Sequence, residues 1–114
     1  MSGWLSQLGL DWAAFKVFFA HASGVSHDAM HVVAGVLAQL ILAAVLRRSV
    51  ASPWPWLVVL LAELVNEWND LHVERWPEVA MQYGEIAKDI GLTMLLPTVL
   101  LIAARWSPGL VARR

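Results

Sequence analysis

Five polar side chains follow one another at helical spacing, and they are the strongest candidates for chemistry in this chain. Glu63, Asn66, Glu67, Asp70 and Glu74 stand at i, i+3, i+4, i+7 and i+11, which places them on one face of a helix. Glu63 has apolar residues on both sides. An ionisable group in such a setting is costly and by default functional. The alternative is a residue that only links neighbouring helices by hydrogen bonds. Oxygen-rich groups of this kind suit Mg²⁺.

Two further polar groups lie at residues 27–31 and 88–89. His27 and His31 have the i, i+4 spacing that allows both rings to bind one metal ion, although a pair of histidines at a membrane surface can also be merely solvated. Asp28 is a carboxylate that can face the stripe at residues 63–74. Lys88 beside Asp89 provides a positive charge for phosphate groups. Alternatively, Lys88 extends to the membrane surface and pairs with Asp89.

Apolar segments of helical length must position these groups. We predict an all-α membrane protein with three transmembrane helices, at about 27–48, 54–75 and 85–106, because backbone groups in a bilayer must be hydrogen-bonded internally. Before them, Leu8, Trp12, Phe15 and Phe19 recur at helical spacing. This pattern predicts an N-terminal amphipathic surface helix at about 8–21. Tryptophans near the ends of the predicted spans are typical of membrane interfaces.

The composition favours the same class. The chain has 114 residues, of which 59% are hydrophobic and 15% are charged, against about 25% charged in ordinary soluble domains. Its length predicts a single domain over residues 1–114. A net charge of −1 and the lack of cysteine argue against a nucleic-acid partner and a disulfide scaffold. A soluble helical bundle would have no polar face for water, so we disfavour it.

The charged residues are predicted to segregate between the two membrane faces. All nine acidic residues and all four histidines fall toward one face, so chemistry belongs there. The opposite face carries only arginines, namely Arg47, Arg48, Arg105, Arg113 and Arg114. The acidic face has three basic residues, Lys16, Arg75 and Lys88. Because positive charge is enriched on the cytoplasmic side, this bias favours an acidic face outside the cytoplasm.

Two short motifs carry a resemblance to a known family. They are Glu63-x-x-Asn66-x-x-x-Asp70 and Ala87-Lys88-Asp89-Ile90-Gly91, with His27-Asp28-Ala29 opening the first membrane helix. This pattern resembles the prokaryotic diacylglycerol kinase family, which includes undecaprenol kinases. Asp28 and Asp70 stand where the family pattern has Glu. The family's architecture, a surface helix followed by three membrane helices, is similar to the one predicted here.

The resemblance implies a multi-pass lipid kinase of the bacterial inner membrane. It would transfer phosphate from ATP to a membrane lipid alcohol of the diacylglycerol or undecaprenol type, with Mg²⁺ as cofactor, and act as a homotrimer. By position, the resemblance implies catalytic roles for Asp70, Glu63 and Asn66, nucleotide binding by Lys88, Asp89 and Glu74, and metal binding by Asp28 and Asp70. Phosphoryl transfer requires neutralised phosphates, a cation and a positioned base, which these residue types provide.

Two other functions are open. One is a non-catalytic small membrane subunit or assembly protein that keeps the same fold. The other is a periplasm-facing metal-binding protein or hydrolase that uses His27, His31, Glu67 and His72. Imidazole ligands favour Zn²⁺ over Mg²⁺, so the identity of the metal separates this function from the kinase.

Overall fold

The protein is built from four α-helices. A computed structural model describes residues 3–74, 76–107 and 109. The helices are α1 (Gly3–Ser23), α2 (His27–Leu46), α3 (Pro53–Val73) and α4 (Val79–Trp106), and these described residues contain no strand. The all-α prediction is confirmed. Two residues of the predicted charge pattern on the arginine face, Arg113 and Arg114, lie outside the described residues, as does Arg75 of the acidic face.

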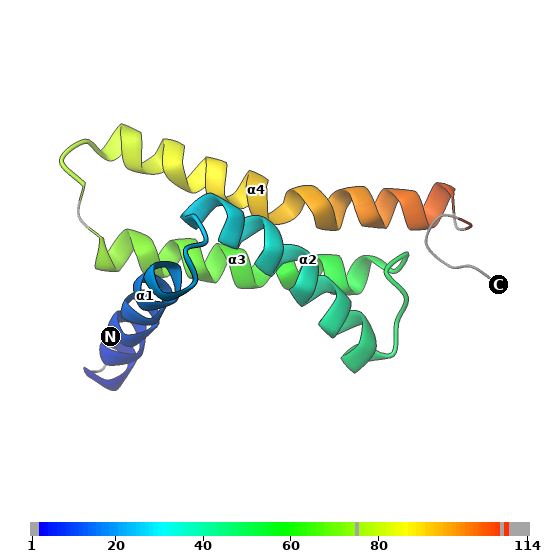
Figure 1. Cartoon of the computed structure of the whole chain (residues 1–114), viewed down its shortest axis with the longest axis horizontal. Helices are drawn as coiled ribbons and strands as arrows, with labels where there is room; N and C mark the ends of the chain where they lie inside the picture. The colour runs from blue at the N-terminus through cyan, green and yellow to red at the C-terminus, as the bar shows by residue number, and fades with distance from the viewer. Residues whose placement is uncertain (1–2, 75, 108, 110–114) are drawn as a thin grey trace.

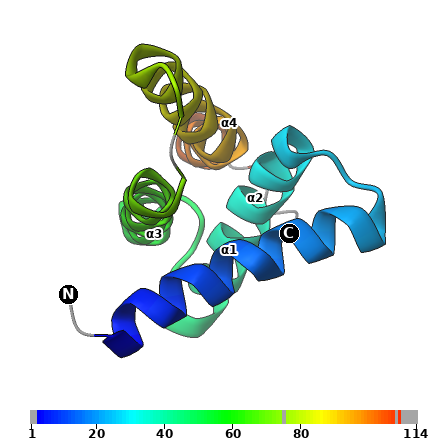
Figure 2. The same ribbon diagram turned by 90° about the vertical axis from the view of Figure 1, so that its left-hand side faces the viewer.

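Three helices form an elongated bundle, and the fourth lies against its side. α3 and α4 run side by side along the long axis, and α2 packs against both (Figure 1). α1 crosses one end of the bundle and contacts α3 (Figure 2). The molecule measures 51 × 28 × 27 Å along its principal axes. The N-terminal end of α2, the C-terminal half of α3 and the N-terminal half of α4 therefore meet at the end that α1 covers.

The helix boundaries follow local capping chemistry. Gly24 has φ of 71° and ends α1, and Ser26 caps α2 by accepting a hydrogen bond from the backbone N–H of Ala29 at 3.1 Å. α2 ends at Leu46 and not at residue 48, because Arg47 adopts a left-handed conformation with φ of 53°. α1 begins at Gly3, earlier than predicted. α4 also begins earlier than the predicted residue 85, at Val79, so Lys88 and Asp89 lie in its third turn.

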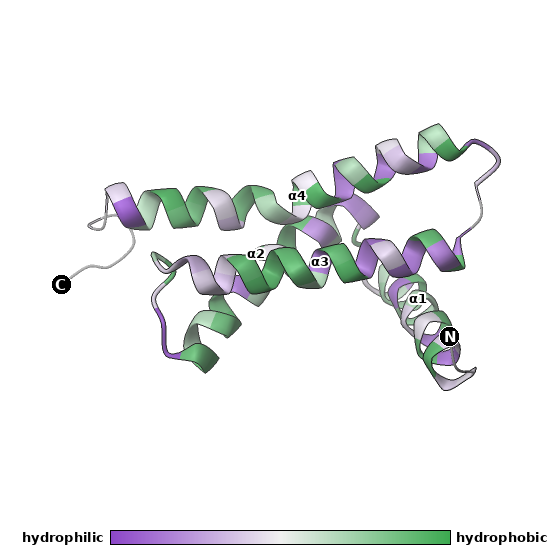
Figure 3. Ribbon diagram, turned by 180° about the vertical axis from the view of Figure 1, so that it is seen from behind, coloured by the Kyte–Doolittle hydropathy of each residue, from purple (hydrophilic) through white to green (hydrophobic). Residues whose placement is uncertain are grey.

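The burial pattern of the bundle is inverted relative to a water-soluble protein. In the described part of the chain, eight polar or charged residues are buried. Only four hydrophobic residues there are buried, and these are alanine, valine and methionine. Large apolar side chains cover the outside instead: Ile41 is 61% exposed, Val45 71% and Val65 65%. Figure 3 shows hydrophilic residues gathered at the end near α1 and mostly hydrophobic residues along the rest of the bundle. An exposed apolar surface of this extent marks an interaction with lipid or protein.

Two helices, α2 and α4, are long and apolar enough to cross a membrane. This capacity to cross a membrane follows from the length and composition of the two described helices alone. α3 is of similar length but does not pass, because the prolines and tryptophans in its first turn and the polar stripe in its second half lower its hydropathy. The described helices thus include two candidate spans, α2 and α4, where the sequence predicted three.

A close approach between α2 and α4 sets the register of the bundle. Pro97 lies inside α4 and has no N–H group, so it leaves the carbonyl of Thr93 without its usual helical hydrogen bond. Gly35 of α2 lies directly against this carbonyl oxygen, where a Cβ atom would clash. One turn further along, Gln39 donates a hydrogen bond from Nε2 to the carbonyl of Pro97 at 3.0 Å. One turn in the other direction, the same register brings His31 to Asp89, with 3.6 Å between Nε2 and Oδ2.

Candidate metal centre

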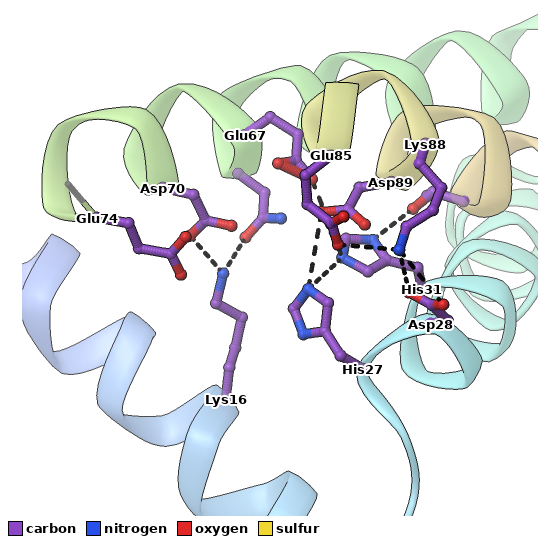
Figure 4. Close-up of polar contacts among 12 residues, drawn as sticks. Lys16, His27, Asp28, His31, Glu67, Asp70, Glu74, Glu85, Lys88 and Asp89 are labelled. Atoms are coloured by element: carbon purple, nitrogen blue, oxygen red, sulfur yellow. Dashed lines mark hydrogen bonds and ion pairs between the residues drawn. The ribbon is translucent and has the colours of Figure 1, made fainter. Parts of the chain in front are cut away.

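His31 is the centre of a buried polar cluster between α2, α3 and α4 (Figure 4). Its ring is 8% exposed. We define the histidine–carboxylate cluster as His27, His31, Glu63, Glu67 and Asp89. The histidines come from the first two turns of α2, the glutamates from successive turns of α3, and Asp89 from α4. All but His27 are buried.

One face of the His31 ring is held by Thr93 and Glu63. The Thr93 hydroxyl donates to Glu63 Oε2 at 2.8 Å, and the same hydroxyl oxygen lies 2.8 Å from His31 Nδ1. Because a hydroxyl has one hydrogen, and Glu63 receives it, the Thr93 oxygen must accept from Nδ1–H. A neutral His31 therefore carries its proton on Nδ1 and presents a lone pair at Nε2. Metal-binding histidines are oriented in this way, by a hydrogen bond at the second ring nitrogen.

The Nε2 atom of His31 faces three other potential ligands. It lies 3.2 Å from His27 Nε2, 3.6 Å from Asp89 Oδ2 and 3.9 Å from Glu67 Oε1. The distance between His27 Nε2 and Asp89 Oδ2 is 3.7 Å. Ligands about 2.0–2.1 Å from a tetrahedral ion lie about 3.3–3.4 Å from one another. The spacing of His27, His31 and Asp89 is thus close to that of three corners of a tetrahedral metal site.

The carboxylates of the cluster also have unsatisfied oxygens. Within the described part of the chain, Glu63 Oε1, Glu67 Oε1 and Asp89 Oδ1 are buried and have no hydrogen-bond partner. A buried carboxylate is costly unless it is paired, hydrogen-bonded or bound to a metal. Two groups of three residues each bring their ligand atoms within 4.8 Å of one another. One group is His31, Glu63 and Glu67, and the other is His27, His31 and Asp89. A cation among them would compensate the buried charge.

Asp70 and Asn66, two of the predicted catalytic residues, lie beside the cluster and contact α1. Lys16 forms an ion pair with Asp70 at 2.7 Å and donates to Asn66 Oδ1 at 3.0 Å. The indole N–H of Trp12 donates to the same amide oxygen at 2.7 Å. The Lys16 and Asp70 side chains are 14% and 9% exposed. These contacts fix α1 across the polar end of the bundle.

Asp28 and Lys88 form a separate group at the surface. Lys88 Nζ lies 3.2 Å from Asp28 Oδ1 and 3.1 Å from Glu85 Oε1, and both Asp28 and Lys88 are about half exposed. The ligand atoms of Asp28, Glu85 and Asp89 are close enough to share an ion. Among the described residues, no group of potential metal ligands contains both Asp28 and Asp70. The metal pair expected from the sequence is therefore not brought together within one protomer.

A cavity of about 300 Å³ connects several of the predicted residues at the polar end. Asp70, Glu74 and Asp89 line it, together with His27 and Glu67 of the cluster. Glu74 caps α3 and accepts a hydrogen bond from the Trp76 indole at 3.3 Å. Since His27 and Asp89 line this cavity, it gives water and small ions a path to the cluster.

Two residues that contact the polar groups of the site, Thr93 and Lys16, were not predicted as site residues, and one predicted ligand, His72, lies outside the cluster. Thr93 had no predicted role, and a hydroxyl inside an apolar helix gives only a weak signal. Lys16 was predicted only as one of the basic residues of the acidic face, because its partner Asp70 is 54 residues away in the sequence. His72 was considered as a ligand. It is exposed, and its Nδ1 lies 2.8 Å from the carbonyl of Trp68, outside the cluster.

Comparison with known proteins gives no family assignment. No family model, no curated protein and no solved structure matches this chain.

Proposed function

We propose that this is an integral membrane protein that binds a divalent transition metal ion, with Zn²⁺ as the best fit, and uses it to hydrolyse an ester of a membrane-bound substrate. The observation that supports this most is the orientation of His31. Thr93 and Glu63 direct its Nε2 lone pair toward His27 and Asp89, whose ligand atoms lie 3.2 and 3.6 Å away. Two imidazoles with one carboxylate resemble the ligand sets of catalytic zinc sites and are less suited to Mg²⁺.

Three ligands leave a fourth position for water, as in catalytic zinc sites. Zinc lowers the pKa of such a water to about 7. Glu67 has a buried oxygen without a partner, 3.9 Å from His31 Nε2. His27, His31 and Asp89 would hold the ion, which would supply an acidified water. Glu67 would take a proton from the water that attacks the carbon or phosphorus of the ester. As the bond to the alcohol breaks, Glu67 would give that proton to the oxygen of the departing alcohol.

The proposal includes three membrane spans, α2, α3 and α4, with α1 at the surface. The outward apolar residues of α3, such as Leu61 and Val65, are 61% and 65% exposed, which supports α3 as the third span despite its polar stripe. Arg47, Arg48 and Arg105 lie at the helix ends opposite the cluster. The positive-inside rule then favours a site outside the cytoplasm, where hydrolysis needs no nucleotide.

A second candidate is the lipid kinase that the sequence resemblance implies. One observation favours it: Asp70, Glu74 and Asp89, three of its implied site residues, line a single cavity. The kinase would require Mg²⁺ and ATP there, a site facing the cytoplasm, and, by resemblance, a homotrimer in which a neighbouring protomer completes the site. Asp28 would need such a neighbour to share an ion with Asp70.

Metal analysis and turnover of the full-length protein separate these functions. Protein purified in detergent, stripped with a chelator and dialysed against Zn²⁺ should retain about one ion per chain. His31→Gln should abolish retention, whereas His72→Gln, a histidine outside the cluster, should not. Glu67→Gln should keep the metal but lose hydrolysis of lipid esters and phosphates.

The same preparation with Mg²⁺, ATP and a lipid alcohol tests the kinase. Phosphorylated lipid formed without any zinc retention would refute the hydrolase and support the kinase. Zinc that binds equally well to wild type and His31→Gln would also refute the proposed site. A protein that retains no metal and turns over no substrate would favour the non-catalytic subunit.

A further inference from the structure

The cavity that leads to the histidine–carboxylate cluster is lined mainly by acidic side chains. Five carboxylates line it, and all of them are labelled in Figure 4: Glu67, Asp70, Glu74, Glu85 and Asp89. The described residues of this lining include no lysine or arginine. Because a cleft lined by charges of one sign concentrates ligands of the opposite sign, this cavity favours a cationic ligand and disfavours an anionic one.

Lysines outside the lining compensate only part of this charge. Lys16 pairs with Asp70 at 2.7 Å, and Lys88 pairs with Glu85 at 3.1 Å. The other three carboxylates have no lysine or arginine partner in the described part of the chain: Glu67, Glu74 and Asp89. Glu67 and Asp89 are each 3% exposed, and each has a buried oxygen without a hydrogen-bond partner. Negative charge therefore remains uncompensated along this cavity.

A zinc ion at the cluster would leave the charge of Glu74 available. The ion brings two positive charges to a cluster that contains three carboxylates, Glu63, Glu67 and Asp89. Glu74 belongs to none of the groups of potential metal ligands among the described residues. Its carboxylate therefore needs a cation other than the proposed metal ion.

An aromatic ring beside Glu74 indicates the kind of cation. Trp76 lines the same cavity and donates its indole N–H to Glu74 Oε2 at 3.3 Å, and Ile86 adds apolar surface to the lining. An organic ammonium is attracted both to a carboxylate and to the face of an indole ring. A hard metal ion prefers a shell of oxygen ligands. The combination of Glu74 and Trp76 thus fits an organic ammonium better than a second metal ion.

We propose that Glu74 and Trp76 form a subsite for an organic ammonium group of the substrate. Glu74 lies seven positions after Glu67, which corresponds to about 10 Å along a helix. The substrate would then be an ester whose ammonium lies within about 10 Å of the bond that is cleaved, whether a lipid headgroup or a soluble molecule carries it. The assignment to the substrate rests on the proposed hydrolase, whereas the binding of an ammonium at Glu74 and Trp76 does not.

Binding of choline to the full-length protein in a non-ionic detergent tests this inference, with the choline methyl groups followed by NMR. Choline should bind at least about tenfold more tightly than neohexyl alcohol, in which carbon replaces the nitrogen, and inorganic phosphate should not bind. Glu74→Gln should weaken choline binding by about fivefold. Glu78→Gln removes an exposed carboxylate that does not line the cavity, and should leave binding unchanged.

Substitutions of tryptophan test the aromatic contact separately. Trp76→Leu should weaken choline binding by about fivefold, whereas Trp76→Phe, which keeps an aromatic face, should retain most of it. Trp68→Leu is the matched control, because Trp68 is 52% exposed and lies outside the lining. If Trp76→Leu does not fold, the contrast between Glu74→Gln and Glu78→Gln still decides the result.

The possible results separate the ammonium subsite from the metal site. Equal binding of choline and neohexyl alcohol, or equal effects of Glu74→Gln and Glu78→Gln, would overturn the subsite. Loss of choline binding when zinc is loaded would also overturn it, because one cation site would then account for both ligands. If choline binds with the expected contrasts while the protein retains no zinc, the subsite is supported and the proposed hydrolase fails.

A membrane-borne ammonium identifies the source of the ligand. Hexadecyltrimethylammonium in the same micelles presents the ammonium group without a phosphate. If it binds more tightly than choline and shows the same loss in Glu74→Gln, the subsite takes a lipid headgroup. If choline binds and hexadecyltrimethylammonium does not, the subsite takes a soluble ammonium. Either result supports the subsite, and failure of both ligands to bind would overturn it.

Discussion

The Thr93 hydroxyl should control metal affinity without touching the metal. Its oxygen lies 2.8 Å from both His31 Nδ1 and Glu63 Oε2, and Thr93 is 4% exposed. Thr93→Val removes both hydrogen bonds while nearly preserving the shape of the side chain. His31 Nδ1 then has only Glu63 Oε2, 3.4 Å away, as an acceptor, so the proton is held less firmly on Nδ1, and a proton on Nε2 blocks the metal. Loss of such an orienting partner lowers metal affinity by about 10- to 100-fold, or about 1.4–2.7 kcal/mol.

Competition with a calibrated chelator measures this effect on the purified protein. Thr93→Val should bind Zn²⁺ about 10- to 100-fold more weakly than wild type, and Thr93→Ser, which restores the hydroxyl, should recover most of the affinity. The apo protein should also lose about 1–3 kcal/mol of stability in Thr93→Val, since Glu63 keeps a buried oxygen without its donor. Wild-type zinc affinity in Thr93→Val, or an equal loss in Thr93→Ser, would refute the argument about the His31 tautomer.

Three further perturbations test the packing and the site. Gly35→Ala should destabilise the protein by about 1–3 kcal/mol, because the new Cβ atom would meet the Thr93 carbonyl. Gly91→Ala is the control: it has open space around it and should be neutral or slightly stabilising in the same thermal melt. Lys16→Met should cost up to about 3–5 kcal/mol by leaving Asp70 buried and unpaired, and adding Asp70→Leu should restore much of this in a double-mutant cycle. Zinc at 100 times its Kd should stabilise the wild-type protein by about 2.7 kcal/mol, and a melting temperature insensitive to zinc would contradict metal binding.

Polar burial explains why this bundle has one defined arrangement. In a lipid environment, apolar side chains gain little by leaving the surface, so packing and hydrogen bonds hold helices together. Gln39, fully buried between α2 and α4, and the Thr93–Glu63 contact between α4 and α3 are bonds of this kind. The contacts that join the helices are therefore the same ones that orient the cluster.

The sequence by itself determined the helices and the separation of charge. The apolar runs and their helical periodicity are local signals, and a helix formed over each predicted segment, although α1 and α4 begin earlier than predicted. The stripe from Glu63 to Asp70 also lies on one buried face of α3. Helical periodicity alone fixes such features, because neighbours three and four residues apart share a face.

Only the tertiary structure decided which polar residues meet. Periodicity gives the face of a residue but not the depth of the neighbouring helix, and a shift of one turn moves a side chain by about 5.4 Å. The contact of Gly35 with the Thr93 carbonyl fixes that depth between α2 and α4. It brings Asp89 to His31 and leaves Asp28 at the surface with Lys88. The grouping of Asp28 with Asp70, which the sequence favoured, is therefore absent within one protomer. Asp70 pairs instead with Lys16, because α1 lies across α3.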